Sequence, residues 1–597
     1  MKHSFVLLVL LCGILRSNAS AAEHVPENRV IYEVFVRNFS PEGNFAGVEK
    51  ELPRLKELGV DVLWLMPVYE LGKTDRWGTY ASPYAIKNYM ALEPDNGDEN
   101  QLRSLVAAAH ELDMEIWFDW VANHTSTDNV WCKEHPEYYG YNFFHPNGWN
   151  DVYQLDVNNE AMHEAMIEAM QYWVDEFDID GYRCDFASGP TEDFWKKATA
   201  RVLKNGKRIA WLAEDDSRPQ LVRNGYFDYN YAWAFNDYLR DDFVRNPALD
   251  VLREKCEAFY KDSDYAGRSR MVYLTNHDKV QEVGDETSAF SEYLKPLTVL
   301  QFTVYGMPLL YNGQEIAWRS GKVSLAEKAT IDWSKSDDSM TNLIRTLCTL
   351  KHTQPALRTG SQSGTFTALA TNSPENVFAY RRTLGEANVV VMLNFSRSAR
   401  NFTVASELPA GVYRDVFTNS TADFGITRTF SLPPLGYAVY VTADDSETPP
   451  VQVPMLYVQN DSGVSPVNVY AWWPEQPELF GAWPGYPLSG TATVDDINFL
   501  TCPLPHSISP YNFIFSNDAL GYKLEKSGMT MTPDKSLFVR ITRNTFEVLN
   551  IDTSVNPVKT EASVAGYFNM QGMPVEKPAK GNIYIVRRGT ETTKELY

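Results

Sequence analysis

Short apolar strands alternate with amphipathic helices along the first part of the chain, from Val30 to about His352. The helical stretches around Leu105 and Met166 keep one apolar face at i, i+3, i+4 and i+7 type spacing. Eight strands are predicted, at 30–36, 61–66, 114–120, 179–185, 208–214, 226–229, 271–277 and 308–311. Eight strand–helix units over roughly 320 residues predict an α/β fold, a (β/α)8 TIM barrel with loop insertions. A doubly wound open sheet is the alternative, but no GxGxxG or Walker sequence marks a nucleotide crevice.

The pattern changes after about Thr359, where helical periodicity gives way to short alternating strands such as 377–382, 389–395 and 437–441. We expect an all-β sandwich there, then a linker around Pro449 and Pro450, then a second all-β segment rich in aromatic residues. The predicted organisation is a signal peptide (1–21), the barrel (22–358), a β-sandwich (359–442), a linker (443–454), a C-terminal β-sandwich module (455–552) and a terminal segment (553–597).

The N-terminus has the order of an export signal. Lys2 and His3 precede an apolar run at 5–15, and a small-residue triplet at 19–21 follows, which predicts cleavage before Ala22. The alternative of lipid attachment at Cys12 is disfavoured because the bulky Leu11 stands where a small residue is usual. We expect export to the periplasm, the cell surface or the medium.

Composition narrows the classes of partner. The 597 residues carry a formal net charge of -23, which argues against nucleic acid, and no stretch after the signal predicts a membrane span. Aromatic residues make up 13% of the chain and suit stacking on the faces of neutral sugars. The five cysteines that follow the signal are far apart and lack CxxC spacing, so neither a disulfide framework nor a zinc site is indicated.

Four of the predicted strands end on a carboxylate: Asp119, Asp185, Glu214 and Asp278. In a (β/α)8 barrel these ends face one pocket, and glycoside hydrolysis needs two carboxylates there, one as nucleophile and one as proton donor. Strand alternation puts Arg183 on the same face as Asp185, so we expect the guanidinium to lower the pKa of Asp185 and favour its ionised form.

These four segments, in order and spacing, resemble the four signature regions of the α-amylase family, glycoside hydrolase family 13. The resemblance implies Asp185 as nucleophile, Glu214 as general acid/base and Asp278 as a carboxylate that grips the sugar hydroxyls, with no cofactor required for the chemistry. It also implies substrate-binding roles for Tyr84, His124, Arg183 and His277, and makes Asp119 the structural carboxylate behind Arg183 and His124.

The sequence departs from the family pattern in three places. Ser188 and Gly189 stand where many relatives have a Lys-His pair that contacts the sugar on the leaving side. The loop at 125–158 is short compared with enzymes that carry a large calcium-holding insert, although Asn123 leaves room for a structural calcium ion. Asn88 stands where many relatives have Asp before the tyrosine.

The aromatic segment that starts at Asn468 resembles starch-binding modules of carbohydrate-binding family 26. Trp472 and Trp483 are the candidates for a stacking platform, because an aromatic face matches the apolar face of glucose. The terminal segment with Gly566 and Gly581 resembles the sorting domain of type IX secretion clients, and a small β-unit packed on the preceding module is the alternative.

We therefore expect a secreted, retaining α-amylase that cleaves internal α-1,4 bonds of starch, glycogen or maltooligosaccharides. Alternatives within the family are a cyclomaltodextrinase- or neopullulanase-like hydrolase and a transglycosylase. The lack of a β-domain before Val30 disfavours the cyclomaltodextrinase type. A non-catalytic glucan-binding protein is the alternative from another class, disfavoured because Asp185, Glu214 and Asp278 are all present.

Overall fold

The computed structural model describes residues 28–442, apart from 336, 407 and 426–428, and residues 455–549 with several gaps. Those gaps are 473–482, 489, 495–496, 504–510, 526–529 and 532–535, and three further strands are described between 566 and 596. The predicted signal peptide and the linker at 443–454 lie outside the described residues. Within the described part, no helix has both the length and the apolar character that crossing a membrane requires.

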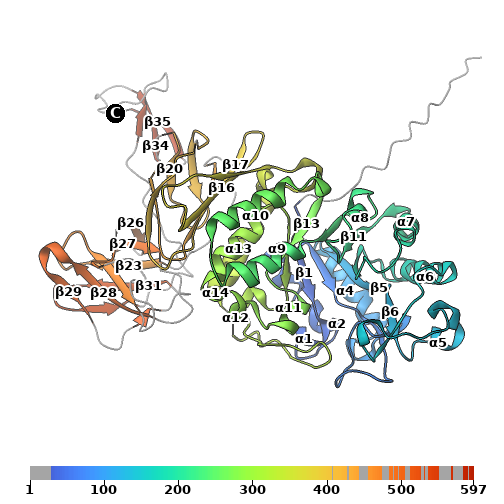
Figure 1. Ribbon diagram of the computed structural model, residues 1–597. Helices are drawn as coiled ribbons and strands as arrows, with labels where there is room; N and C mark the ends of the chain where they lie inside the picture. Colours follow the sequence, from blue (N-terminus) through green and yellow to red (C-terminus); the bar gives the residue numbers. More distant parts are fainter. Residues whose placement is uncertain are drawn as a thin grey trace, which may run out of the picture.

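Eight parallel strands close into a barrel in the order β1-β14-β13-β12-β11-β8-β5-β2 (Figure 1). They are β1 (Ile31–Val34), β2 (Val62–Leu65), β5 (Glu115–Val121), β8 (Gly181–Asp185), β11 (Ala210–Ala213), β12 (Tyr229–Tyr231), β13 (Ser269–Val272) and β14 (Met307–Tyr311). Each barrel strand is hydrogen-bonded to the barrel strands before and after it in the chain, and the ring closes between β14 and β1. The predicted (β/α)8 barrel is confirmed.

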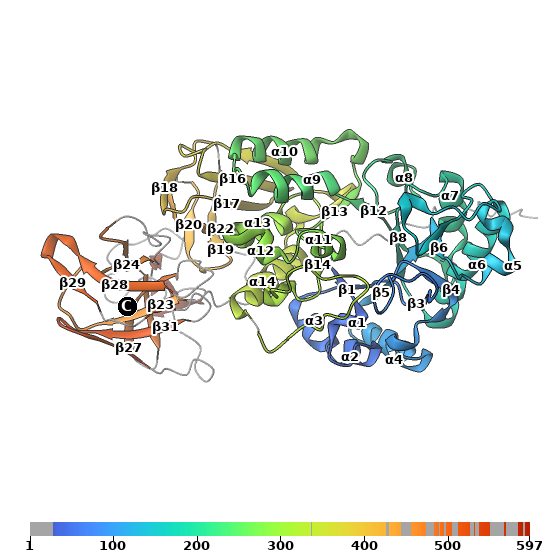
Figure 2. The same ribbon diagram turned by 60° about the horizontal axis from the view of Figure 1, so that its bottom comes forward.

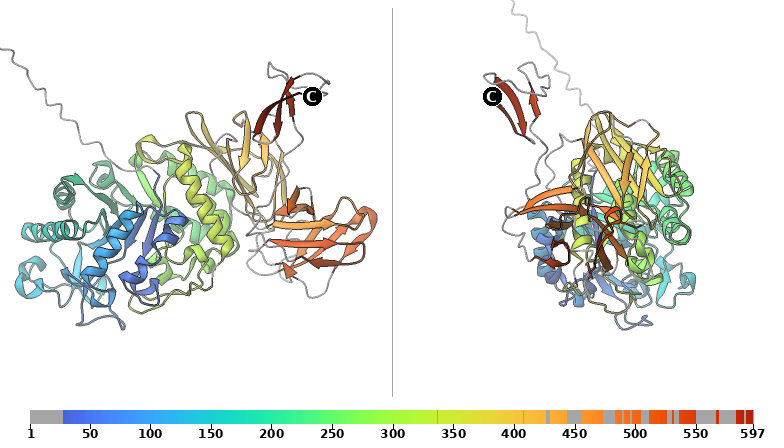
Figure 3. Two further views of the ribbon diagram at one scale, coloured as in Figure 1. Left: turned by 180° about the vertical axis from the view of Figure 1, so that it is seen from behind. Right: turned by 90° about the vertical axis from the view of Figure 1, so that its left-hand side faces the viewer.

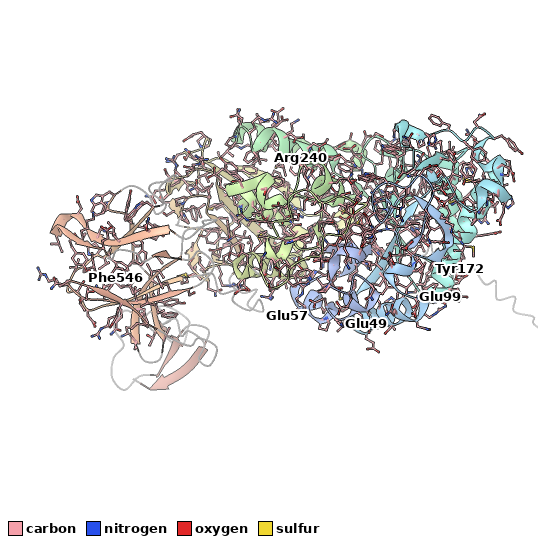
Figure 4. All side chains as sticks on the ribbon, turned by 90° about the horizontal axis from the view of Figure 1, so that it is seen from below. Glu49, Glu57, Glu99, Tyr172, Arg240 and Phe546 are labelled. Atoms are coloured by element: carbon pink, nitrogen blue, oxygen red, sulfur yellow. The ribbon has the colours of Figure 1, made fainter. Side chains whose placement is uncertain are left out.

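Helices surround the strands on the outside (Figure 2). They are α1 (Val36–Phe39), α2 (Phe45–Glu49), α3 (Leu52–Leu58), α4 (Glu99–Glu111), α5 (Trp131–Glu134), α6 (Glu160–Phe177), α7 (Glu192–Arg201), α8 (Gln220–Arg223), α9 (Trp233–Asp237), α10 (Leu249–Lys261), α11 (His277–Glu282), α12 (Glu286–Phe290), α13 (Leu294–Thr303) and α14 (Asp338–Thr353). On α3 and α4 the outer faces are polar, and Glu57 and Glu99 are exposed there (Figure 4).

Local sequence explains where the long helices begin and which face they bury. Asp98 and Gln101 form a capping box at the start of α4, and the Asn159 side chain caps α6 by accepting a hydrogen bond from the Met162 amide. The apolar face of α6 that includes Met166 is buried, as its spacing predicts. These faces cover the outside of the barrel and hold the strands in place.

Two strands differ from their predicted positions. The sixth was predicted at 226–229, but the amides of Tyr226 and Phe227 donate to the Leu221 carbonyl, so pairing starts only at β12. The seventh was predicted at 271–277, but β13 ends at Val272, and the side chain of Asn276 already caps α11. The loop between β13 and α11 thus brings the start of α11 to the C-terminal end of the barrel.

Two hairpins stand above the C-terminal ends of β2 and β5. One consists of β3 (Tyr69–Leu71) and β4 (Ile86–Leu92), the other of β6 (His124–Ser126) and β7 (Val152–Gln154). Strands β4 and β6 lie in contact, so the two hairpins form one wall beside the barrel opening.

The first β-sandwich packs on the barrel through β15, β16 and β17, which contact α10 and α13. Its sheets contain β15 (Thr365–Leu369), β16 (Val377–Leu384), β17 (Ala387–Asn394), β22 (Tyr437–Thr442), β19 (Val412–Asp415) and β20 (Thr421–Asp423), and the pair β18 (Arg400–Thr403) and β21 (Thr429–Leu432). One buried apolar cluster runs from the barrel into this sandwich, for example from Leu297 to Val391. The two domains therefore share a core.

A second sandwich lies at the end of the molecule away from α5 and α6 (Figure 3). One sheet has β26 (Gly490–Val494), β27 (Ile497–Pro503), β23 (Met455–Asn460), β31 (Leu537–Ile541) and β32 (Phe546–Val548). The other has β25 (Tyr486–Pro487), β24 (Asn468–Trp472), β28 (Tyr511–Asn517), β29 (Tyr522–Leu524) and β30 (Thr530–Met531). It has a core of its own, and the last strands, β33 (Gly566–Phe568), β34 (Ile583–Arg588) and β35 (Glu591–Leu596), form a separate small sheet. The predicted all-β organisation after the barrel is confirmed.

Candidate active site

The three carboxylates predicted to do the chemistry meet at the C-terminal end of the barrel. Asp185 is the last residue of β8, Glu214 directly follows β11, and Asp278 lies in the first turn of α11. Parallel barrel strands all end on one face, which brings these positions together. All three line a cleft of about 730 Å³, together with the predicted binding residues Tyr84, His124 and His277.

Arg183 connects two of these carboxylates from below. Its side chain is fully buried; Nη1 lies 3.1 Å from Asp185 Oδ1 and 2.8 Å from Asp119 Oδ1, and Nη2 lies 2.9 Å from Glu214 Oε2. Strand alternation placed Arg183 beside Asp185 in the sequence analysis, but its contact with Glu214 depends on the neighbouring strand. One guanidinium therefore fixes both candidate catalytic groups.

The carboxylate of Asp119 is fully buried and accepts three hydrogen bonds, one of which is part of an ion pair. The donors are Arg183, the Trp64 indole at 3.1 Å and the Tyr84 hydroxyl at 3.1 Å. The expectation that Asp119 also stands behind His124 is not met, since the His124 ring is paired with the Asn123 amide, at 3.3 Å. Asp119 thus orients Arg183 and Tyr84.

Glu33 belongs to the site, although the sequence analysis did not identify it. It lies on β1 with no exposed side-chain surface, and its carboxylate accepts from His277 Nδ1. His277 Nε2 lies 2.8 Å from the Tyr84 hydroxyl and 3.3 Å from Asp278 Oδ1, and its ring stacks on that of Tyr84. An acidic residue inside an otherwise apolar strand was the signal available in the sequence.

The charges on this side of the cleft support one another. Although burial opposes it, the carboxylates of Asp278 and Glu33 raise the pKa of His277 well above its usual range. Burial raises the pKa of Asp278, but the imidazolium of His277 has the larger combined effect and lowers this pKa to about 2. Asp278 is therefore ionised across the physiological range, ready to accept hydrogen bonds from hydroxyl groups.

The other two carboxylates have raised pKa values. Burial raises the pKa of Glu214 to about 8; Arg183 opposes this shift, while Asp185 and Asp278 add to it. Burial also raises the pKa of Asp185 to about 6, so the expected lowering by Arg183 has the right sign but is outweighed by desolvation. Near pH 7 the pair is thus poised with Glu214 protonated and Asp185 ionised.

His124 lies on β6, at the wall formed by the two hairpins. Burial lowers its pKa to about 4, so the imidazole is neutral near pH 7. The Trp149 ring meets it edge to face, with the ring centroids 6.0 Å apart. Trp149, Trp77 and Phe186 are half-exposed and line the cleft; the sequence analysis named none of them, because loop positions carry no periodicity.

The weak metal candidate, Asn123, is engaged by another amide. Gln154 Nε2 donates to Asn123 Oδ1 at 3.0 Å and to the Asn123 carbonyl at 2.8 Å, and Asn123 Nδ2 lies 3.3 Å from Gln154 Oε1. These oxygens are the atoms that a calcium ion would need, so the site fits an amide pair and not a cation.

Elsewhere in the described chain, Glu160, His163 and Asp193 form the one group with metal-ligand geometry. The ammonium of Lys197 already bridges its two carboxylates, at 2.5 Å from Glu160 and 2.7 Å from Asp193.

The proposed starch-binding rings also lie together. Tyr470 and Trp472 project from β24 with ring centroids 5.7 Å apart, and Trp483 meets Tyr470 edge to face at 5.6 Å. The Trp483 indole donates to Asp518 at 2.9 Å, which fixes a ring that is 41% exposed. Neither Trp472 nor Trp483 lines the cleft in the barrel.

A (β/α)8 barrel that carries an arginine-bridged pair of carboxylates at its C-terminal end defines a glycoside hydrolase of the barrel type. The family model "Alpha amylase, catalytic domain" matches residues 16–154 and 137–362, and the model "Maltogenic Amylase, C-terminal domain" matches 366–439. The chain belongs to the α-amylase family, glycoside hydrolase family 13.

Individual relatives are distant. The chain is 24% identical to Alpha-amylase 2 of Dictyoglomus thermophilum over 70% of its own length and 76% of that protein. It is 24% identical to a cyclomaltodextrinase of Thermoanaerobacter pseudethanolicus over 59% of its own length and 64% of that protein. The crystal structure of the maltogenic α-amylase AmyB from Thermotoga neapolitana superposes with a TM-score of 0.60 at 28% identity, covering 69% of this chain and 98% of that one.

Proposed function

We propose that the protein is a retaining hydrolase of α-1,4-linked glucans, with Asp185 as nucleophile, Glu214 as general acid/base and Asp278 as a substrate-binding carboxylate. The observation that carries this proposal is the Arg183 guanidinium, which contacts both Asp185 and Glu214. A shared cation keeps the two carboxyl groups close together. That favours the retaining arrangement, in which they are about 5 Å apart, over the wider inverting one.

The protonation states support the first step. Glu214 donates its proton to the glycosidic oxygen while Asp185 attacks the anomeric carbon; the bond to the leaving sugar breaks and a glycosyl ester forms on Asp185. In the second step the Glu214 carboxylate takes a proton from water, whose oxygen attacks the same carbon and releases Asp185. Two inversions return the α-anomer.

The substrate is proposed from the relatives. They include proteins named as α-amylase, cyclomaltodextrinase and maltogenic α-amylase, and the sandwich after the barrel matches a maltogenic amylase model. We propose that maltooligosaccharides and cyclomaltodextrins are the preferred substrates. An endo-acting α-amylase on polymeric starch is the second candidate, favoured by the ring cluster of Tyr470, Trp472 and Trp483 outside the cleft.

Export is proposed on the sequence alone, from the basic, apolar and small-residue order of residues 1–21. Appearance of the mature N-terminus at Ala22 in secreted or periplasmic protein tests this. Retention of the leader on intracellular protein contradicts it.

Product analysis tests the function. Wild-type protein and Glu214→Gln are compared on maltoheptaose, a cyclomaltodextrin and soluble starch, with the anomer of the first product followed by NMR. Faster cleavage of the short and cyclic substrates with α-anomeric products supports the first candidate, and preferential random cleavage of starch supports the second. Binding of glucan without cleavage by either protein overturns the proposal in favour of a binding protein.

A further inference from the structure

Phe186 directly follows the proposed nucleophile and has an unusual backbone. Its φ is +41°, in the left-handed region that bulky side chains rarely adopt. The side chain is 49% exposed and lines the cleft. A large apolar side chain held in a strained conformation at a catalytic opening points to a function for the ring, because strain of this kind persists only where the surroundings enforce it.

Hydrogen bonds around Phe186 hold its backbone in this left-handed conformation. Its amide donates to Glu214 Oε2 at 2.7 Å, and its carbonyl accepts from the Gly189 amide at 2.8 Å. The next residue is tied to the same strand, since the Ala187 amide donates to the Glu214 carbonyl at 3.2 Å. The turn after β8 is thereby fixed to the end of β11, and Phe186 and Glu214 line the same cleft.

Gly189 lies directly against this ring. A Cβ atom at Gly189 would come within 2.8 Å of Phe186 Cδ1 and 2.4 Å of Asn123 Oδ1. No larger side chain fits there unless one of these groups moves. Gly189 stands where many relatives carry the second residue of the Lys-His pair. The absence of a side chain at Gly189 therefore leaves room for the Phe186 ring.

We infer that Phe186 is the platform for the sugar on the leaving side of the scissile bond, an inference that rests on the proposed function. Glu214 must face the glycosidic oxygen of the leaving group, and the Phe186 amide is bonded to the same carboxyl group. The ring therefore flanks the leaving sugar and contacts its apolar face. Binding on this side is apolar, without the charged hydrogen-bonding groups that a Lys-His pair would supply.

The test compares a substrate that has a leaving sugar with one that has none. Maltopentaose must place glucose units beside Phe186, whereas α-maltosyl fluoride releases only fluoride. For Phe186→Ala we expect kcat/KM on maltopentaose to fall about tenfold more than kcat/KM on the fluoride. Phe186→Tyr keeps an aromatic ring, so its kcat/KM on maltopentaose should recover most of what Phe186→Ala loses. Phe144→Ala removes an exposed ring that does not line the cleft and is the matched control.

The outcomes separate the inference from the function on which it rests. Equal losses on both substrates mean that Phe186 acts only through the placement of Glu214, and the platform is rejected. A second measurement is direct: maltopentaose binding to Glu214→Gln should weaken about tenfold when Phe186→Ala is added, and an unchanged affinity overturns the inference. If the wild-type protein cleaves neither substrate, the proposed function fails and the inference with it.

Discussion

At the scale of single residues, the site depends on one arginine shared between two acids. Arg183 makes ion pairs with Asp185 and Glu214, yet burial raises both of their pKa values. Neighbouring carboxylates raise both pKa values further, and each acid accepts one hydrogen bond that favours its ionised form, Asp185 from Arg183 and Glu214 from the Phe186 amide. The order of the two pKa values, about 6 for Asp185 and about 8 for Glu214, supports the proposed roles of Asp185 as nucleophile and Glu214 as proton donor.

This order predicts a bell-shaped pH profile of kcat/KM. Activity should appear as Asp185 ionises, with a pKa of about 6, and disappear as Glu214 loses its proton, with a pKa of about 8. The Asp278 carboxylate raises the pKa of Glu214, so Asp278→Asn should move the alkaline limb to lower pH as well as reducing activity. Steady-state kinetics on maltopentaose from pH 4 to 10 checks this, because release of the leaving sugar from this substrate needs the Glu214 proton. An alkaline limb that stays in place in Asp278→Asn contradicts it.

The same pKa shift predicts a stability effect. Burial holds the pKa of Glu214 at about 8 in the folded protein against an ordinary value of 4.5, so the folded state binds this proton more tightly than the unfolded chain does. Its contribution to stability is complete below pH 4.5 and is lost as the pH rises towards 8. Glu214→Gln removes that loss, so its Tm should exceed that of the wild type by a margin that grows from pH 5 to pH 8. A constant margin in thermal scans would argue against the raised pKa.

At the scale of elements, an amide pair ties the end of β5 to β7. Gln154 Nε2 donates to Asn123 Oδ1, to the Asn123 carbonyl and to the Leu155 carbonyl, at 3.0, 2.8 and 3.2 Å. The side-chain amide of Gln154 thus occupies the position next to these three oxygens that a bound cation would take. His124 follows Asn123 directly, so this pair also positions the wall of the cleft.

We therefore predict that calcium is not needed for stability. Incubation with EGTA should leave the Tm unchanged, whereas Gln154→Ala should cost about 1–3 kcal/mol, since it removes the Gln154 donor from Asn123 Oδ1 and from the Leu155 carbonyl. The control is Gln362→Ala, at an exposed position in the short 3-10 helix (Gly360–Gln362) that precedes β15. Thermal unfolding with and without EGTA decides this point, and a drop in Tm with EGTA would show that a cation site exists in this protein.

The sequence predicts Asp185, Glu214 and Asp278 because each lies at the C-terminal end of a predicted strand, although the structure places Asp278 in the first turn of α11 and not at the end of β13. Glu33 could not be predicted as a partner of His277, because the two are joined only when β1 and β14 close the barrel beside β13. Phe186 could not be predicted for a different reason: its backbone conformation depends on tertiary hydrogen bonds, which no local sequence pattern indicates.

At the scale of the whole molecule, a catalytic barrel and a sandwich with a shared core are followed by a second sandwich with a core of its own. The aromatic cluster of Tyr470, Trp472 and Trp483 lies on that second sandwich, outside the cleft. We propose this cluster as a starch-binding surface that is separate from the cleft in the barrel.

The cluster predicts a specific loss of adsorption. Trp472→Ala and Trp483→Ala should each weaken binding to insoluble starch about tenfold, because each removes a ring that stacks on glucose. Val548→Ala removes a comparably exposed apolar side chain from the opposite sheet and should bind as the wild type does. Pull-down isotherms on granular starch measure the effect, and equal adsorption by all four proteins would remove the cluster from the binding surface.

The central claim, that Asp185 forms a covalent bond to the sugar while Glu214 serves as acid and base, is tested most directly by trapping the intermediate. In Glu214→Gln, α-maltosyl fluoride can still react, because fluoride leaves without a proton donor, but water is no longer activated to release the sugar. Peptide mass spectrometry should then find one maltosyl group attached to Asp185. A maltosyl group on any other carboxylate, or no adduct while the fluoride is still consumed, would contradict the account.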